Sequence, residues 1–382
     1  MRPVTVMTIF GTRPEAIKMA PLALELSRRP GLNALCCVTA QHRQMLDSVL
    51  EVFDLKPDWD LDIMTPRQTL STITSKCLTG MDEAIDALKP DMILVHGDTS
   101  TTFAGALSAF YHQVSVGHVE AGLRTYDKYS PFPEEMNRTL VGDIADLHFC
   151  PTRANRENLA REGITEGVFL TGNTVIDALM MTVAGDYDFG DDLKDVDFHN
   201  HRVILLTTHR RENLGEPMRH IYKALRRIIE EIPDTEIVFP VHRNPLVRKV
   251  VEEELAGVDR IHLIDPMEYE PFANLMSLSS LVLTDSGGIQ EEAPSLGKPV
   301  LVLRNTTERP EAVEAGTVRL IGTDKDVVYA ETKRLLTDQA AYDAMSNAVN
   351  PYGDGKASQR IVQAILHDFA GEEGLPDDFS QA

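Results

Sequence analysis

The chain is poor in cysteine and has no long apolar run. Its 382 residues include four cysteines, with no CxxC pair and no spacing suited to a metal site or a disulfide framework. We therefore predict a reduced, intracellular protein. No apolar stretch approaches the roughly 18 residues of a membrane-spanning helix, and the first ten residues lack the features of a secretion signal. The sequence predicts a cytoplasmic protein that does not cross a membrane.

Basic residues are also in the minority. Lys and Arg number 37 against 59 Asp and Glu, which gives a formal net charge of −22 with histidine neutral. A chain this acidic is a poor general binder of nucleic acid or anionic membranes, so neither is an expected partner. Any anionic ligand must then be held by a local cluster of cations.

Several motifs of nucleotide and hydrolase chemistry are missing. The chain has no GxGxxG and no GxxxxGK[ST], so it lacks the fingerprints of nicotinamide-binding domains and of ATP-binding P-loops. It also lacks HExxH and the GxSxG elbow of serine hydrolases. We expect neither a cofactor nor a bound metal.

Short apolar runs alternate with segments of helical period along most of the chain, which is the pattern of βαβ units and a parallel sheet. The strands predicted in the first half are 4–10, 34–39, 92–96, 114–119, 147–150 and 168–170. Those predicted in the second half are 203–207, 236–240, 261–264, 281–284, 299–303 and 318–321. The acidic stretch 185–201 has no apolar period and is predicted to be an exposed connection.

At this length two domains are expected. The two strand sets predict an α/β protein with two Rossmann-like domains, each built on a parallel sheet, over residues 1–172 and 173–356. The last residues, 372–382, are predicted to form a flexible acidic tail. Ligands of such folds bind at the carboxyl ends of the strands, so we expect the ligand in the cleft between the domains.

Cations follow the first predicted strand. Gly11 leads into a helix start that carries Arg13 and Lys18, and free amides and cations together suit an anionic ligand. A solvated helix start is the alternative, but a cation at a strand end is costly to bury without a partner.

Carboxylates follow the next strands. Asp98 and Glu120 come directly after two predicted strands, and Glu134 lies in the segment PFPEE. Asp98 alone could cap a helix. Crowded carboxylates raise the pKa of one member of the group, so the three together indicate proton transfer.

The second half repeats this arrangement with histidine and arginine. His209 and Arg210 follow the strand 203–207 and supply the local cations that a phosphate needs. His242 follows the next strand, and it could equally be a core histidine. The turn Ser286-Gly287-Gly288 would let a backbone approach a diphosphate closely, and Glu292 could accept hydrogen bonds from a ribose.

The motifs GTRPEAIKMAPL, HGDTSTT, GHVEAGLRT, PFPEEMNR, THRREN, PVHRNP and TDSGGIQEEAPSLGKPVLVLRNTTERPEA closely resemble those of the non-hydrolysing UDP-N-acetylglucosamine 2-epimerases. The resemblance spans nearly the whole chain, apart from the acidic connection and the tail. It implies a fold of glycosyltransferase B type whose last helix, here about residues 357–371, crosses back to the first domain. It also implies a homodimer that interconverts UDP-N-acetylglucosamine and UDP-N-acetylmannosamine, by elimination and re-addition of UDP through a glucal intermediate.

The resemblance also implies roles for individual residues. The implied catalytic groups are Asp98, Glu120, Glu134 and His209, with the histidine near the diphosphate. The implied substrate-binding residues are Arg13, Lys18, Phe272, Ser286, Gly287, Gly288, Glu292 and Arg309. Bacterial members have a second, regulatory substrate site, and its motif is matched by Gln41, Gln44, Arg67 and His242.

Three other functions stay open on the residues alone. A glycosyltransferase of the same fold would bind the nucleotide in a similar way. A hydrolysing 2-epimerase would release free N-acetylmannosamine. A non-catalytic sensor would bind the nucleotide sugar without turnover, and loss of a carboxylate would be its expected sign, whereas Asp98, Glu120 and Glu134 are all present.

Overall fold

The computed structural model describes residues 2–41, 43–65, 67–371 and 374–380, and the chain forms two compact units. The first unit runs up to Met181 and includes Tyr352–Ser380, and the second comprises Thr182–Pro351. The limits drawn from the sequence, at 172 and 356, lie nine and five residues from Met181 and Pro351, where the chain crosses between the units. Among the described residues, no helix has the length and apolar character needed to cross a membrane.

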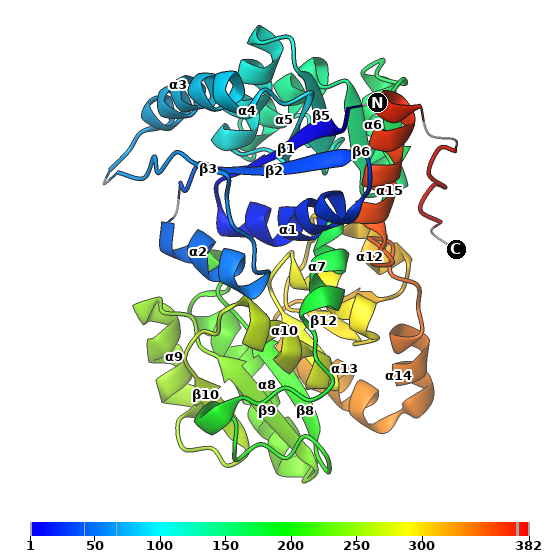
Figure 1. The fold of residues 1–382 in the computed structure, drawn as a ribbon. Coiled ribbons are helices and arrows are strands. Elements are labelled where there is room, and N and C mark those ends of the chain that lie inside the picture. Colours follow the sequence, from blue (N-terminus) through cyan, green and yellow to red (C-terminus); the bar gives the residue numbers. More distant parts are fainter. Residues whose placement is uncertain (1, 42, 66, 372–373, 381–382) are drawn as a thin grey trace. The chain divides into compact units, whose positions relative to one another are not determined.

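The first unit is a seven-stranded sheet in the order β3-β2-β1-β4-β5-β6-β7, with every pair parallel (Figure 1). Its strands are β1 (Val4–Phe10), β2 (Leu32–Val38), β3 (Trp59–Asp60), β4 (Met92–His96), β5 (Ser115–Val119), β6 (Leu147–Cys150) and β7 (Val168–Leu170). Its helices are α1 (Arg13–Arg28), α2 (Arg43–Val52), α3 (Leu70–Leu88), α4 (Ser100–Tyr111), α5 (Glu134–Ile144), α6 (Arg153–Arg161), α7 (Thr174–Thr182), which ends at the crossing, and α15 (Ala357–Ile365), which continues as a π-helical turn (Leu366–Ala370).

The second unit is a six-stranded parallel sheet in the order β10-β9-β8-β11-β12-β13. Its strands are β8 (Arg202–Thr207), β9 (Thr235–Pro240), β10 (Ile261–Ile264), β11 (Leu281–Thr284), β12 (Val300–Val302) and β13 (Val318–Leu320). Its helices are α8 (Glu216–Glu231), α9 (Pro245–Leu255), α10 (Tyr269–Leu278), α11 (Ile289–Glu292), α12 (Pro310–Glu314), α13 (Lys325–Thr337) and α14 (Gln339–Ser346). Short 3₁₀ turns occur at Gly190–Asp192, Arg211–Asn213 and Ala293–Leu296.

The predicted fold class is confirmed, because two parallel sheets alternate with helices along the chain. Each strand predicted from the sequence is present, with ends that shift by at most two residues. The short strand β3 was not predicted, because two residues are too few to show an apolar pattern. The central strands read as continuous apolar runs because helices bury both faces of a parallel sheet.

Helix α15 belongs to the first unit, where it packs against α1. Asp177 of α7 holds its start, since the carboxylate accepts the backbone amides of Ala357 at 3.1 Å and Ser358 at 2.7 Å. Burial raises the pKa of Asp177, and these amides act in the opposite direction. The two segments through which the chain passes between its units are thus fastened together.

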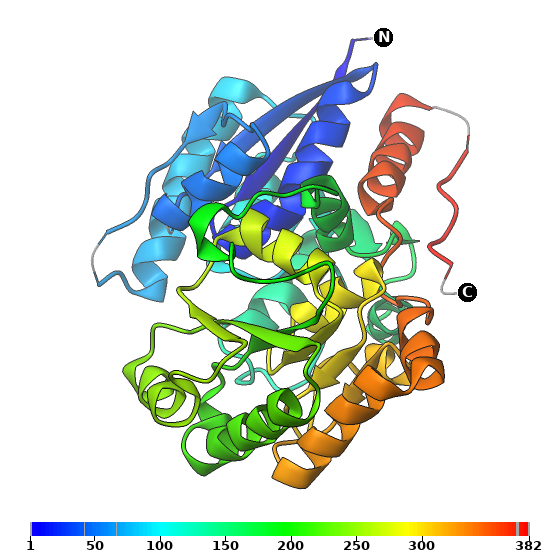
Figure 2. The same ribbon diagram turned by 90° about the horizontal axis from the view of Figure 1, so that it is seen from below.

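In the described part of the C-terminal tail Phe379 is buried, whereas most of residues 374–380 are exposed. Residues 374–380 run beside α15 in both views (Figures 1 and 2). Phe379 lies in an apolar cluster with Cys150, Leu159 and Leu170, and its amide donates to the Leu170 carbonyl at 2.8 Å. A single aromatic side chain therefore anchors this segment to the first unit.

Candidate active site

The loops after β1 and β4 are joined by one buried carboxylate, Glu15. It accepts the amides of Gly11 and Thr12 and the hydroxyl of Thr99, which caps α4. Gly11 is needed here, because an added Cβ would lie 1.9 Å from Oγ1 of Thr39. The sequence predicted this turn as an anion-binding helix start, and the structure shows that Glu15 occupies two of its amides.

Glu120 follows β5 in a strained backbone conformation, with φ of +63°, which residues other than glycine seldom adopt. Its Oε2 pairs with Nζ of Lys18 and accepts Nδ2 of Asn173 at 3.2 Å. Nε2 of His96 lies 3.4 Å from the same oxygen. Burial alone would raise the pKa of Glu120, but Lys18 and then His96 hold it well below the usual range. Glu120 is therefore a carboxylate that stays ionised.

Asp98 follows the neighbouring strand β4 and has the opposite character. Burial raises its pKa, and the nearby charges of Glu120 and Glu134 raise it further, although Arg138 acts against them. The guanidinium of Arg138 lies 3.2 Å from Oδ2 of Asp98 and 3.4 Å from Oε2 of the buried Glu135. The first unit thus brings together two carboxylates whose pKa values are shifted in opposite directions.

The loops of the second unit hold a histidine against an aspartate. Nδ1 of His209 lies 2.9 Å from Oδ1 of Asp285, and Asp285 is fully buried. The same carboxylate accepts the backbone amides of His209 and Arg210 and the side chain of Asn213. With Nδ1 engaged, Nε2 of His209 is the ring nitrogen left for a ligand.

The turn Ser286-Gly287-Gly288 follows Asp285 and leads into the short helix α11. A Cβ added to Gly287 would lie 3.9 Å from a guanidinium nitrogen of Arg210, so a cation stands beside this turn. One turn along, a Cβ on Gly288 would lie 3.5 Å from Oε1 of Glu292. Arg210, the two glycines and the carboxylate of Glu292 therefore lie together after β8 and β11, and their role in binding a diphosphate stays a prediction.

Two further predicted binding residues lie in the same unit. Arg309, at the start of α12, pairs with the buried Glu291 and donates to the Glu308 carbonyl at 3.1 Å. Phe272 is half-buried on α10. The role of Arg309 as a direct ligand contact stays a prediction.

The four residues of the predicted regulatory site are divided between the units. In the first unit, Gln44 and Arg67 are exposed, and Oε1 of Gln41 is buried with no hydrogen-bond partner within the described residues. In the second unit, the exposed ring of His242 stacks on His209, with centroids 5.8 Å apart and planes inclined at 22°. His242 is therefore a neighbour of a predicted catalytic residue.

Comparisons with known proteins agree in pointing to one family. The sequence profile of the UDP-N-acetylglucosamine 2-epimerases matches residues 24–366. The chain belongs to this family. It is 56% identical to the UDP-N-acetylglucosamine 2-epimerase of Bacillus subtilis strain 168 over 387 aligned residues, which cover all of both chains.

Solved structures extend the comparison. A crystal structure of a UDP-N-acetylglucosamine 2-epimerase superposes with a TM-score of 0.94 at 55% identity and covers all of both chains. The enzyme from Neisseria meningitidis, solved with UDP-GlcNAc bound, has a TM-score of 0.83 at 49% identity and covers 95% of this chain and all of its own. Both similarities extend over essentially the full length of the family fold.

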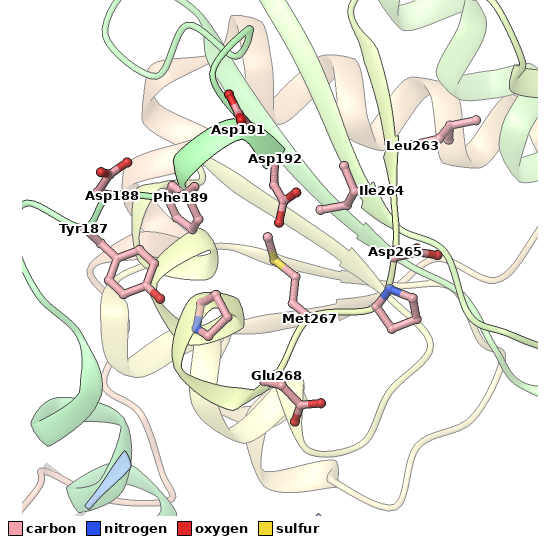
Figure 3. Close-up of a pocket in the computed structure, with 12 residues that line it drawn as sticks. Tyr187, Asp188, Phe189, Asp191, Asp192, Leu263, Ile264, Asp265, Met267 and Glu268 are labelled. Atoms are coloured by element: carbon pink, nitrogen blue, oxygen red, sulfur yellow. The ribbon is translucent and has the colours of Figure 1, made fainter. Parts of the chain in front are cut away.

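A separate cavity of about 640 Å³ lies at the edge of the second sheet, beside β10 (Figure 3). Five of its twelve lining residues are carboxylates, namely Asp188, Asp191, Asp192, Asp265 and Glu268. An anionic diphosphate would be repelled by these carboxylates. Within the described chain, no three His, Cys, Asp or Glu side chains gather so as to hold a metal ion.

Sequence reasoning did not select four residues of this site. They are His96 and Asn173 beside Glu120, Arg138 beside Asp98, and Asp285 beside His209. Three of them, His96, Arg138 and Asp285, lie inside the motifs HGDTSTT, PFPEEMNR and TDSGGIQEE, which the resemblance to the family already includes. Their roles come from contacts between distant segments, which spacing along the chain does not reveal.

Proposed function

We propose that this protein interconverts UDP-N-acetylglucosamine and UDP-N-acetylmannosamine without hydrolysis, by inverting carbon 2 of the sugar. The proton on carbon 2 is not next to a carbonyl, so its direct removal would leave an unstabilised carbanion. Removing it as UDP leaves carbon 1 forms a glucal instead. UDP then adds back to carbon 1 while a proton is delivered to the other face of carbon 2.

The main support for this proposal is that the pKa values of Asp98 and Glu120 are shifted in opposite directions. Inversion at one carbon needs a base on one face and an acid on the other. Glu120 stays ionised beside Lys18, whereas burial favours the protonated form of Asp98. Two carboxylates whose pKa values are pushed apart are the expected signature of such an acid and base pair. Glu134, at the start of α5, adds to the electrostatic shift of Asp98.

The second unit supplies the groups proposed to hold UDP. His209, fixed by Asp285, would donate from Nε2 to the leaving diphosphate, and Arg210 would neutralise its charge. The turn at 286–288 would receive the phosphates and Glu292 the ribose. Phe272 and Arg309 are proposed nucleobase and phosphate or sugar contacts, with Arg13 and Lys18 as further cations for the anion.

The test is product analysis in deuterated water with UDP-N-acetylglucosamine as the sole substrate. We expect deuterium at carbon 2 of both UDP-sugars and no free sugar, with heat-inactivated protein as the control. Free N-acetylmannosamine would identify a hydrolysing enzyme. Binding without any exchange at carbon 2 would identify a transferase or a sensor, and either result would refute the proposal.

A second nucleotide-sugar site is proposed at Gln41, Gln44, Arg67 and His242. Its supporting observation is that His242 stacks on His209, so a ligand contacting His242 would act directly on a catalytic neighbour. The unpaired Oε1 of Gln41 offers an acceptor. Arg67, Arg210 and Arg243 are the cations that a second anion would need.

A homodimer is also proposed, through the helices α4 and α5. These helices pack together, and they expose Phe110 at 61% and Tyr111 at 66%, with Met136 and Leu140 each at 38%. Exposed apolar groups of this size are typical of interaction surfaces. Sedimentation analysis should give a dimer for the native chain and a monomer for Phe110→Glu, and a native monomer would contradict the proposal.

A further inference from the structure

His96 ends strand β4, two residues before Asp98, and is almost fully enclosed, at 4% exposure. Neither of its ring nitrogens has a hydrogen-bond partner in the described part of the chain. Native proteins rarely bury polar atoms in this state, because contact with water is lost and nothing replaces it. Two enclosed ring nitrogens without a hydrogen bond, at the end of the strand that leads to Asp98, call for an explanation.

The group nearest to the ring is the carboxylate of Glu120. Nε2 of His96 lies 3.4 Å from Oε2, the oxygen that also meets Lys18 and Asn173. No hydrogen bond to Oε1 of Glu120 is present among the residues described, and the side chain keeps 17% exposure. The donors therefore converge on one carboxylate oxygen and leave the other for a ligand.

Two other buried histidines of this sheet, His118 and His148, have structural roles and serve as a comparison for His96. His118 and His148 pair in register on β5 and β6, and both contact backbone carbonyls, those of Gly97 and Ala145. Burial lowers the pKa of His118 to about 3 and that of His148 to about 4, so both rings are neutral. His96 differs because its close neighbour is a catalytic carboxylate.

We propose that His96 is a positioning residue for Glu120, whose Nε2–H donates to Oε2 and turns Oε1 toward the substrate. The inference rests on the proposed function, because it needs Glu120 to transfer the proton at carbon 2. A small movement on substrate binding closes the gap from 3.4 Å to an ordinary hydrogen bond. In this arrangement Nε2–H of His96 serves only as a hydrogen-bond donor, and Oε1 of Glu120 takes up and returns the substrate proton.

This role has a signature in the pH dependence. The titratable groups facing Glu120 are Lys18 from α1, His96 from β4 and Asp98 from the following turn. A donor bound to the ionised carboxylate lowers its pKa, so removing His96 raises the pKa of Glu120. The acidic limb of the kcat/KM profile then moves to higher pH, by about one unit. A merely structural histidine would leave this limb in place.

Three substitutions of His96 distinguish the position of its hydrogen-bond donor from the size of its side chain. His96→Gln places an amide nitrogen near the position of Nε2, His96→Asn places one near Nδ1 and out of reach of Glu120, and His96→Leu removes the donor. We expect kcat to fall about 10- to 100-fold in the Asn and Leu variants, with KM within a few-fold of the wild type and most activity kept in the Gln variant. His148→Asn is the matched buried control and should keep the wild-type kcat and pH profile.

Equal kcat in His96→Gln and His96→Asn, or the wild-type acidic limb in both, would overturn the proposal. If His96→Leu fails to fold, as judged by thermal unfolding, the Gln and Asn pair still decides the question.

A measurement without substrate tests the role of His96 separately from the proposed function. The pKa of Glu120 can be read in the ligand-free protein by NMR of ¹³C-labelled glutamate carboxyls, with the signal assigned through Glu120→Gln. It should be higher in His96→Asn than in the wild type and His96→Gln, and equal values would refute the role of His96. A wild type that fails to epimerise would refute the proposed function and leave this result standing by itself.

Discussion

Nδ1 of His209 and Oδ1 of Asp285 lie 2.9 Å apart, and the aspartate is fully buried behind the histidine. Asp285 also binds the backbone amides of His209 and Arg210, so one carboxylate fixes both the imidazole and the turn that carries it. This contact joins residues 76 positions apart in the chain. It leaves Nε2 of His209 as the ring nitrogen that is proposed to meet the departing diphosphate.

Asp285→Asn should therefore remove most activity. An amide in place of the carboxylate carries no negative charge to balance the protonated ring that would donate from Nε2, and it can turn an N–H group toward the backbone donors, so we expect kcat to fall about 100- to 10,000-fold. The free energy of unfolding should fall by about 1–3 kcal/mol, because buried donors lose their acceptor. Asp324→Ala, which removes the cap of α13, is the control that loses stability and keeps kcat. A folded Asp285→Asn with wild-type kcat would show that His209 needs no anionic partner.

The same carboxylate predicts a pH dependence of stability. Burial alone would raise the pKa of Asp285, but His209 and the amides of the turn bring it below its usual value of 3.8. A depressed pKa contributes stability that is fully present above 3.8 and is lost as the pH falls through the folded-state value. Denaturant unfolding from pH 6 down to about 2 should therefore lose less free energy in Asp285→Asn than in the wild type. Parallel curves would contradict this assignment.

Lys18→Met separates two roles for a lysine that sequence reasoning placed with the diphosphate. Its contact with Glu120 predicts that the pKa of this carboxylate rises in the variant, and that the acidic limb of kcat/KM moves upward by about 1–3 units. Because Lys18 is also proposed as a further cation for the anion, the Kd for UDP should rise as well, by up to a few-fold. Arg13→Met, at the start of the same helix, is the comparison and should weaken UDP binding. An unchanged pH profile with a large loss of UDP affinity would show that Lys18 binds the diphosphate and does not act on Glu120.

A regulatory site predicts that UDP-N-acetylglucosamine activates its own interconversion. The reverse reaction should stall on pure UDP-N-acetylmannosamine and begin when a trace of UDP-N-acetylglucosamine is added, because binding at the second site favours the active state. Arg67→Ala should abolish this activation, whereas Arg28→Ala, another exposed arginine, should preserve it. Steady reverse turnover without a lag would mean that Gln41, Gln44, Arg67 and His242 form no such site.

The fold was accessible from the sequence because buried parallel strands are short apolar runs, and here these runs recur at regular intervals between helices. The exceptions have local causes. β3 spans only Trp59–Asp60, and the acidic tail packs through a single residue, Phe379, which composition does not single out. Long-range anchoring of this kind depends on a surface that forms only once the sheet has folded.

The site was accessible in part. Asp98, Glu120 and His209 could be selected because they follow strands, where parallel sheets place their ligands. Their partners could not be selected, since Asp98 meets Arg138, Glu120 meets Lys18, and His209 meets Asp285 only in three dimensions. The direction of each pKa shift depends on these partners, and with it the division between acid and base.

The division of labour between Asp98 and Glu120 is tested most directly by deuterium exchange at carbon 2, measured separately with each UDP-sugar in Asp98→Asn and Glu120→Gln. If the two carboxylates serve opposite faces, neither variant interconverts the sugars, yet each still exchanges the carbon 2 proton of one epimer, and the two variants exchange opposite epimers. Loss of exchange with both epimers in both variants, or wild-type interconversion in either, would contradict the account.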